Sequence, residues 1–404
     1  MYNWPYQRTI MPFSRKTGAS GMRGMLKAAI DSLICFESSF HKRAPALQAK
    51  KRILILRKDG LGDCIIFYPT LAAYREFYKN DEMTLVFPIA FKSLSPLLAS
   101  IENVIWFDAK KFSGDLLYRR KFLLDLHRKN FDIAIYPVFS REAAGDMMMR
   151  AAAAKETIGF RGQNDSLYNK VVSLPETVRL EIDRDMRFAE SITGKKIVAS
   201  FPTIDIKRLP NGTSDELIRK HSLDKKQFVI VFPGAGEPYK IWQPEKFAAI
   251  IDYFIEKDVM PVVCGNERER DLVKEILVKA SHADRAVDLS GQTDLPTMAH
   301  LLARSKLYFG SDTGILHLAV ALEVPSIALA WEGSFGRFFP YGDPNRNVAI
   351  TVHPKTPAEA GSAPSAPLDL GKLHPSVRDI SVNQAIEELE KMERSLDINA
   401  HDHE

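Results

Sequence analysis

The sequence predicts an α/β protein made of two open, doubly wound domains. Two series of short apolar β-type runs alternate with helical stretches, and a glycine-containing turn follows the first run of each series. The chain has 404 residues, of which 45% are hydrophobic and 26% charged, enough for two sizeable cores. A cleft between two such domains is the natural place for a ligand.

The first series defines a domain expected over residues 51–205. Its β-type runs are Ile53–Leu56, Met83–Phe87, Val104–Phe107, Ile133–Tyr136 and Thr157–Phe160. Helical patterns lie between them, through Tyr74, near Ser93–Ala99, over Leu116–Arg128 and over Met147–Ala154. Residues 161–185 are polar and irregular, and a helix over about Asp183–Thr193 leads out of the domain.

The second series defines a domain expected over residues 206–352. Its β-type runs are Phe228–Phe232, Met260–Cys264, Ala286–Leu289, Leu307–Phe309 and Ser326–Ala330, with helices at about Pro244–Lys257, Glu267–Ala280 and Leu295–Ala303. Residues 353–376 contain five prolines and predict a flexible surface segment. Residues 377–404 form a last helix, about Val382–Ser395, and a polar tail.

The N-terminal arm, residues 1–50, is basic. Residues 1–52 hold ten Lys or Arg and two acids, a balance of +8 in a chain of net charge +4, so the remainder carries −4. Apolar residues recur at three- and four-residue spacing between Met22 and Ile34, which predicts an amphipathic helix. This helix either lies on an anionic membrane surface or packs on the globular body.

The remaining composition indicates a cytoplasmic protein. Cys35, Cys64 and Cys264 are far apart and give neither a metal-binding pair nor a disulfide framework, which fits a reducing compartment. No apolar run approaches the length of a membrane span, and the arm lacks the features of a signal peptide. No nucleic-acid partner is expected.

The first chemical motif is the turn from Arg57 to Asp63, directly after the strand Ile53–Leu56. Gly60 and Gly62 let the backbone approach a ligand, and Asp63 can accept a proton or hold a polar group. The turn lacks the third glycine of a dinucleotide fingerprint and the Gly-Lys-Ser/Thr of a P-loop. The alternative interpretation is that Asp63 only caps a helix.

Two segments of the second domain suit a phosphate group. Gly234 follows a strand and Lys240 comes a few residues later, so backbone N–H groups and one cation are available, although a Pro-Gly turn with an exposed lysine would look the same. The segment Ser311-Asp312-Thr313-Gly314 follows another strand and begins a helix whose first turn includes His317. A helix start of this kind favours an anion.

In combination these motifs resemble glycosyltransferase family 9, the ADP-heptose:lipopolysaccharide heptosyltransferase group, which has the two-domain GT-B fold. The matching stretches are Gly60-x-Gly62-Asp63 with Pro69, Pro233-Gly234-Ala235 with Lys240 and Trp242, Asp288-Leu289-Ser290-Gly291, Asp312-Thr313-Gly314-x-x-His317-x-Ala319 and Pro325-x-x-Ala328-Leu329. They occur in the family's order across about residues 51–342. The basic arm and the proline-rich segment fall outside the resemblance.

The resemblance implies an inverting glycosyltransferase with Asp63 as catalytic base and Gly60 and Gly62 in the acceptor-side loop. The nucleotide-sugar donor, an ADP-sugar by preference, would lie in the second domain. Its phosphates and nucleotide would contact Gly234, Lys240, Ser311, Asp312, Thr313, Gly314 and His317. Glu267, or else Glu269, would bond a ribose hydroxyl, unless this acid only begins a helix. The acceptor would be a lipopolysaccharide-like glycolipid or other surface glycan at the inner face of the cytoplasmic membrane, reached with help from residues 1–52.

No cofactor and no metal site are expected, because no Asp-x-Asp pair of the sort that holds a divalent ion with a nucleotide sugar is evident and the histidines are scattered. One departure concerns the sugar: Trp331-Glu332-Gly333-Ser334 stands where the family usually has a Gly-Pro-Thr type of turn. Two other functions use the same scaffold, a nucleotide-sugar epimerase or hydrolase and a non-catalytic nucleotide-sugar or glycan-binding module.

Overall fold

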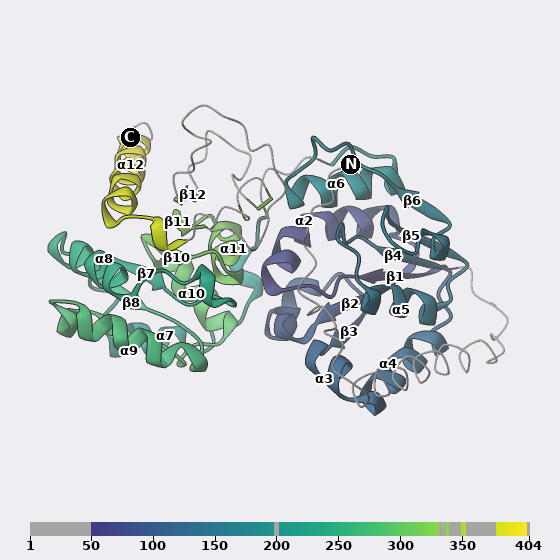
Figure 1. Cartoon of the computed structure of the whole chain (residues 1–404), viewed down its shortest axis with the longest axis horizontal. Helices are drawn as coiled ribbons and strands as arrows, with labels where there is room; N and C mark the ends of the chain where they lie inside the picture. The colour runs from purple at the N-terminus through teal and green to yellow at the C-terminus, as the bar shows by residue number, and fades with distance from the viewer. Residues whose placement is uncertain are drawn as a thin grey trace, which may run out of the picture.

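The protein forms two α/β domains that lie side by side, each built on a parallel six-stranded sheet (Figure 1). This computed structural model describes residues 50–197, 202–330, 334, 337–338, 349–352 and 377–401, without the side chains of 349–352 and 395–401. The expected N-terminal helix and the proline-rich segment 353–376 therefore lie outside the described residues.

The first sheet has the strand order β3-β2-β1-β4-β5-β6. Its strands are β1 (Arg52–Leu56), β2 (Glu82–Pro88), β3 (Asn103–Phe107), β4 (Ile133–Tyr136), β5 (Glu156–Phe160) and β6 (Lys170–Val172). The helical elements are α2 (Leu61–Phe77), η1 (Ile89–Leu98), α3 (Ala109–Gly114), α4 (Leu116–Arg128), α5 (Ala143–Ala152), η2 (Asp165–Leu167) and α6 (Glu181–Thr193). Helices cover both faces, so a central strand such as β1 is apolar after its first residue, Arg52, and Ile53–Leu56 are fully buried.

The second sheet has the order β12-β11-β10-β7-β8-β9. Its strands are β7 (Phe228–Phe232), β8 (Met260–Val263), β9 (Val287–Asp288), β10 (Leu307–Ser311), β11 (Ser326–Leu329) and β12 (Ala349–Val352). Its helices are α7 (Ser214–Lys220), α8 (Pro244–Glu256), α9 (Arg270–Lys279), α10 (Leu295–Arg304), α11 (Gly314–Ala321) and α12 (Val382–His401). Short 3-10 turns are η3 (Ile206–Arg208), η4 (Pro238–Lys240), η5 (Glu267–Glu269), η6 (Ala283–Arg285) and η9 (Val377–Asp379).

Both sheets reverse their strand order at a central pair, β1 with β4 in the first and β7 with β10 in the second. In open α/β sheets ligands bind beyond the carboxyl ends of the strands at such a point. The turns singled out from the sequence follow β1, β7 and β10. The topology therefore places all of them where a ligand is expected.

The predicted fold class and the alternation of strands and helices are confirmed, with local differences. The structure adds α3 and α7, which were not predicted, and η2 and the short strand β6 lie within residues 161–185. The helix expected near Ser93–Ala99 is the 3-10 element η1, which contains Pro96, a residue without an N–H to donate. The helix expected from Glu267 starts with the 3-10 turn η5. Strand β12 was not predicted, although Ile350, Thr351 and Val352 are β-branched residues; it pairs with β11. The exact domain limits remain predictions.

Apolar side chains connect the two domains. One cluster of buried residues runs from Ile53 in β1 to Ile230 in β7. Arg208, in the chain that links the domains, donates to the Tyr68 hydroxyl at 2.9 Å and to the Pro96 carbonyl at 3.3 Å. Across the described residues, every helix is too short or too polar to cross a membrane.

Candidate active site

The site lies where the first turns of α2 and α11 face each other across the two domains (Figure 1). Gly62 in α2 lies directly against the imidazole of His317 in α11, so closely that a Cβ on Gly62 would collide with the ring. A Cβ on Gly314 would come within 3.0 Å of Leu61. Gly62 therefore has no room for a side chain and Gly314 has little, and two positive helix ends lie close together.

Asp63 is in the first turn of α2 and is half-buried. Its Oδ2 accepts the Gly60 N–H at 3.2 Å, so the capping role is present. Capping does not exclude a role as base, because a carboxylate has two oxygens and several lone pairs. The capping bond fixes the carboxylate at the interdomain edge of α2.

A buried arginine that sequence reasoning left without a role supports this loop. Arg57 is 1% exposed, and its Nη1 donates to the Pro137 carbonyl and to Asp185 Oδ1, both at 2.7 Å. Its Nη2 lies 3.4 Å from the Asp63 carbonyl, and its Nε lies 3.2 Å from Asp59 Oδ2. A charged residue directly after an apolar strand was the available signal, but its partner on α6 is 128 residues away.

The charged groups of this loop shift each other's pKa values. Burial by itself would lower the pKa of Arg57, but the carboxylates of Asp185 and Asp59 raise it, so the guanidinium stays charged. Burial raises the pKa of Asp59 to about 6, although Arg57 opposes the rise. A permanent cation is thus held beneath the Asp63 loop.

On the opposite side, Asp312 lies between Lys240 and His317. The carboxylate is buried, with its Oδ2 3.6 Å from Lys240 Nζ and its Oδ1 3.8 Å from His317 Nε2. The Ser334 hydroxyl donates to the same Oδ2. Burial lowers the pKa of His317, against the carboxylates of Asp312 and Asp63, so the ring is neutral at neutral pH. The structure brings Lys240, Asp312 and His317 together as the sequence predicted.

The hydroxyls next to Asp312 serve the fold. Ser311 is fully buried and donates to the Pro233 carbonyl at 2.9 Å, which ties β10 to the turn after β7. Thr313 caps α11, its Oγ1 accepting the Ile315 N–H at 3.3 Å. The backbone N–H groups of the first helical turn have no intrahelical acceptor, so they are available to a phosphate.

The structure distinguishes between the two acidic candidates for a ribose contact. Glu269 packs its carboxylate onto Gly234, and its Oε2 accepts the Asn266 N–H at 2.7 Å. Burial raises the pKa of Glu269, partly offset by the bonds from Asn266. Glu267 is 70% exposed and pairs with Arg270 at 3.2 Å. Only Glu269 reaches the turn after β7.

Trp242 lies close to Lys240 in sequence but belongs to the core. It is fully buried and donates its indole N–H to the Ile380 carbonyl at 2.9 Å. Lys246 adds bonds to the carbonyls of Arg378 and Ile380, both at 2.7 Å. The segment from Val377 into α12 is thereby fastened to the start of α8, which also fixes the end of the loop that carries Lys240.

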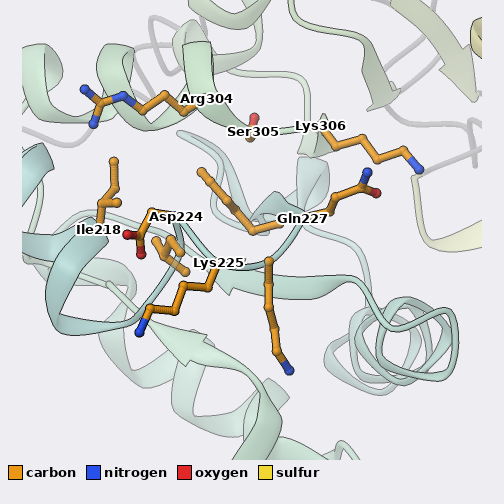
Figure 2. A pocket seen from close by; sticks show the side chains of 10 residues that line it. Ile218, Asp224, Lys225, Gln227, Arg304, Ser305 and Lys306 are labelled. Atoms are coloured by element: carbon orange, nitrogen blue, oxygen red, sulfur yellow. The ribbon is translucent and has the colours of Figure 1, made fainter.

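A separate cavity of about 640 Å³ lies at the opposite edge of the second sheet, where β7 and β10 begin (Figure 2). Its lining includes Lys225, Arg304 and Lys306, whose charged ends point in different directions. Arg304 also pairs with Asp215 at 2.7 Å. Because the charged ends diverge, they do not converge on an anion. Arg304 is in the last turn of α10, where a cation complements the helix dipole.

In the part of the chain that the structure describes, no group of three or more His, Cys, Asp or Glu could hold a metal ion. Cys64 and Cys264 are buried and unbridged. The candidate site combines the carboxylates of Asp63 and Asp312, one lysine, a neutral histidine and two helix ends.

Known proteins were compared with the chain and its structure. The family model for glycosyltransferase family 9 (heptosyltransferase) matches residues 119–362, more than half of the chain. The lipopolysaccharide core heptosyltransferase OpsX of Haemophilus influenzae is 23% identical over 330 residues, 80% of this chain and 90% of that protein. The lipooligosaccharide heptosyltransferase 2 of Haemophilus ducreyi is 22% identical over 292 residues, 70% and 83% of the two chains.

Solved structures share the fold. A glycosyltransferase family 9 protein from Veillonella parvula superposes with a TM-score of 0.69 at 21% identity, covering 85% of this chain and 97% of that one. The E. coli ADP-heptose lps heptosyltransferase II gives a TM-score of 0.65 at 21% identity, with 86% and 99% covered. The protein thus has the GT-B fold of glycosyltransferases. The chain belongs to glycosyltransferase family 9.

Proposed function

We propose that this enzyme transfers a heptose from an ADP-sugar to a lipopolysaccharide-type glycolipid acceptor, with inversion at the anomeric carbon. The observation that carries the proposal is the contact between Gly62 and His317, which sets the helix that bears Asp63 opposite the Asp312–His317 segment. The names of the heptosyltransferases similar to this chain support the donor and the acceptor class.

In the proposed reaction Asp63 takes the proton of the acceptor hydroxyl while that oxygen attacks the anomeric carbon. The bond from this carbon to the diphosphate oxygen breaks, and the nucleotide diphosphate leaves with the electron pair. Lys240 and the N-terminus of α11 stabilise its charge. One displacement inverts the configuration, because the acceptor enters opposite the leaving group.

Three further residues complete the proposed donor site. Gly234 lets the turn after β7 approach the nucleotide, and Glu269, rather than Glu267, bonds the ribose, because only its carboxylate lies against that turn. Neutral His317 supports the phosphate loop through Asp312. We propose that no metal ion is needed, since a lysine and a helix dipole occupy the role that a divalent ion would have.

We also propose that the enzyme works in the cytoplasm at the inner face of the membrane, where residues 1–52 provide positive charge. An epimerase or hydrolase, the first alternative, would turn over the nucleotide sugar without an acceptor. A binding module, the second, would bind it without any turnover. The purified enzyme would be incubated with ADP-, GDP- and UDP-sugars, with and without acceptor glycolipid and with EDTA. We expect transfer from an ADP-sugar that EDTA does not reduce; turnover without acceptor, or binding without turnover, would contradict the proposal.

A further inference from the structure

The chain after β11 crosses from the donor domain to the acceptor domain. Ser334 is 1% exposed and bonds Asp312 in the donor site. The carbonyl of Arg337, three residues later, accepts the Glu181 N–H at 2.8 Å. The Nε atom of Arg337 lies 3.5 Å from Glu181 Oε2. Glu181 is the first residue of α6 in the other domain. One short segment therefore contacts the candidate donor site and the acceptor domain.

Phe338 makes the apolar part of this contact. Its ring centroid lies 5.7 Å from that of His317. On the other side Phe338 packs against Ile66 of α2 and Ile182 and Met186 of α6, which form a small cluster of their own. The Arg337 guanidinium lies over the Phe338 ring at 4.7 Å. The ring is thus wedged between the candidate donor site and two helices of the acceptor domain.

The ionic part is buried and crosses the domain boundary. Glu181 is 3% exposed and lies between Arg184, at 3.3 Å, and Arg337, at 3.5 Å. A buried carboxylate needs its cationic partners, and removing one of them is costly. Arg337 supplies one partner only while the two domains are together.

We infer that Ser334, Arg337 and Phe338, here called the interdomain clamp, are positioning residues for the transfer reaction. The clamp holds Asp312 and His317 at a fixed distance from α2, so that donor phosphates and Asp63 reach a productive geometry together. This inference rests on the proposed function. Ser334 of the clamp is also the last residue of the Trp331–Ser334 stretch in which this sequence departs from its family.

The test separates positioning from mere stabilisation. Arg337→Gln and Phe338→Ala would be compared with wild type for kcat, donor KM, ADP affinity by calorimetry and radius of gyration by small-angle scattering. We expect kcat to fall about tenfold or more, since a displacement of about 1 Å can cost a factor of 100. ADP affinity should stay within about threefold, because Lys240 and α11 are untouched. Phe338→Leu should restore most of the rate.

Arg187→Gln is the matched control, since it removes a pair with Glu190, at 3.1 Å, that lies within α6 alone. It should leave all four readouts unchanged. Equal losses of ADP affinity and kcat, or wild-type rates in both clamp variants, would overturn the inference. An inactive wild-type enzyme would refute the proposed function instead, and scattering would still show whether the clamp variants separate the domains.

A second, independent feature is an apolar and basic patch on the acceptor domain. At the start of α4, Leu116 is 40% and Leu117 80% exposed. The exposed cations around them are Lys110, Lys111, Arg120 and Lys121. Two acids in the same stretch, Asp108 and Asp115, accept backbone N–H groups as helix caps, and Asp125 further along α4 pairs with Arg128 at 3.5 Å. Exposed leucines among cations are typical of surfaces that contact anionic lipid.

The position of this patch fits a membrane contact. Helices α3 and α4 follow the carboxyl end of β3, and β3, β2 and β1 are parallel neighbours. The Gly60–Asp63 turn follows β1, so patch and acceptor-side loop share one edge of the sheet. We further infer that Leu116, Leu117 and the four cations form a docking surface for an anionic bilayer.

Sedimentation with vesicles tests this surface on the full chain. We expect binding to phosphatidylcholine vesicles that contain phosphatidylglycerol to exceed binding to phosphatidylcholine alone, and Leu116→Ser with Leu117→Ser to weaken it about tenfold. Val278→Ser, at an 85% exposed residue of the other domain, is the control and should change nothing. Undiminished binding of the double variant would overturn the inference and leave residues 1–49 as the membrane contact. Equal binding to both vesicles would also overturn it.

Discussion

Gly62 of the first domain lies in direct contact with His317 of the second, without room for a single methyl group between them. The two residues are in the first turns of α2 and α11, so their contact sets the distance between Asp63 and the candidate phosphate site. Four predictions follow from this arrangement.

Gly62→Ala should separate the two helix ends. The added methyl collides with the His317 ring, and we expect kcat/KM to fall about 100-fold while ADP affinity is nearly unchanged. Gly60→Ala is the control, because its Cβ would meet only Asp63 Oδ2, at 3.3 Å, and we expect a smaller loss. Steady-state kinetics and calorimetry with ADP measure both effects. Wild-type kinetics in Gly62→Ala would show that this contact does not set the reacting geometry.

Asp63→Asn should remove the base but keep the helix cap. The amide oxygen can still accept the Gly60 N–H, whereas the side chain can no longer take a proton. We expect transfer to fall by about 100- to 10,000-fold with an unchanged melting temperature. Asp63→Ala should lose the cap as well and melt earlier. Substantial transfer by Asp63→Asn would refute the assignment of the base.

Lys240→Met should weaken binding of the nucleotide diphosphate. Losing a cation that bonds a diphosphate removes about 1.5–3 kcal/mol, so ADP should bind about 10- to 100-fold more weakly. Lys246→Met serves as the matched control. That lysine bonds the Arg378 and Ile380 carbonyls, so its loss should lower stability and spare ADP binding. Calorimetry and thermal unfolding distinguish the two lysines, and equal effects on ADP would contradict the site.

His317 should make stability depend on pH. Burial depresses its pKa in the folded state, so below the unfolded value of about 6.5 the unfolded chain binds more protons. Its contribution is therefore present above pH ~6.5 and lost as pH falls through the depressed folded value. In His317→Gln the melting temperature should fall less between about pH 6.5 and 5 than in wild type. Parallel curves for the two proteins would count against a buried neutral histidine.

Much of the fold was predictable from local pattern. The strands were recognised because buried parallel strands are continuous apolar runs, and the turn glycines because they interrupt such runs. Three candidates for the phosphate site were recognised from their places after strands. Lys240 and Asp312 follow two central strands of the second sheet, and His317 is in the first turn of the helix after the second of them. Strand β12 was missed although it carries β-branched residues, because it is only four residues long and its pairing with β11 is a tertiary contact.

By itself the sequence determined the two α/β domains, the family to which the motifs point, and the turns that carry chemistry, since these depend on residues close together in the chain. Only the tertiary structure decided which residues meet. It paired Arg57 with Asp185 and Arg337 with Glu181, chose Glu269 over Glu267 at the turn after β7, and turned the Ser311 hydroxyl inward. These outcomes depend on contacts between distant segments, and a buried charge or hydroxyl finds its partner only when the domains pack.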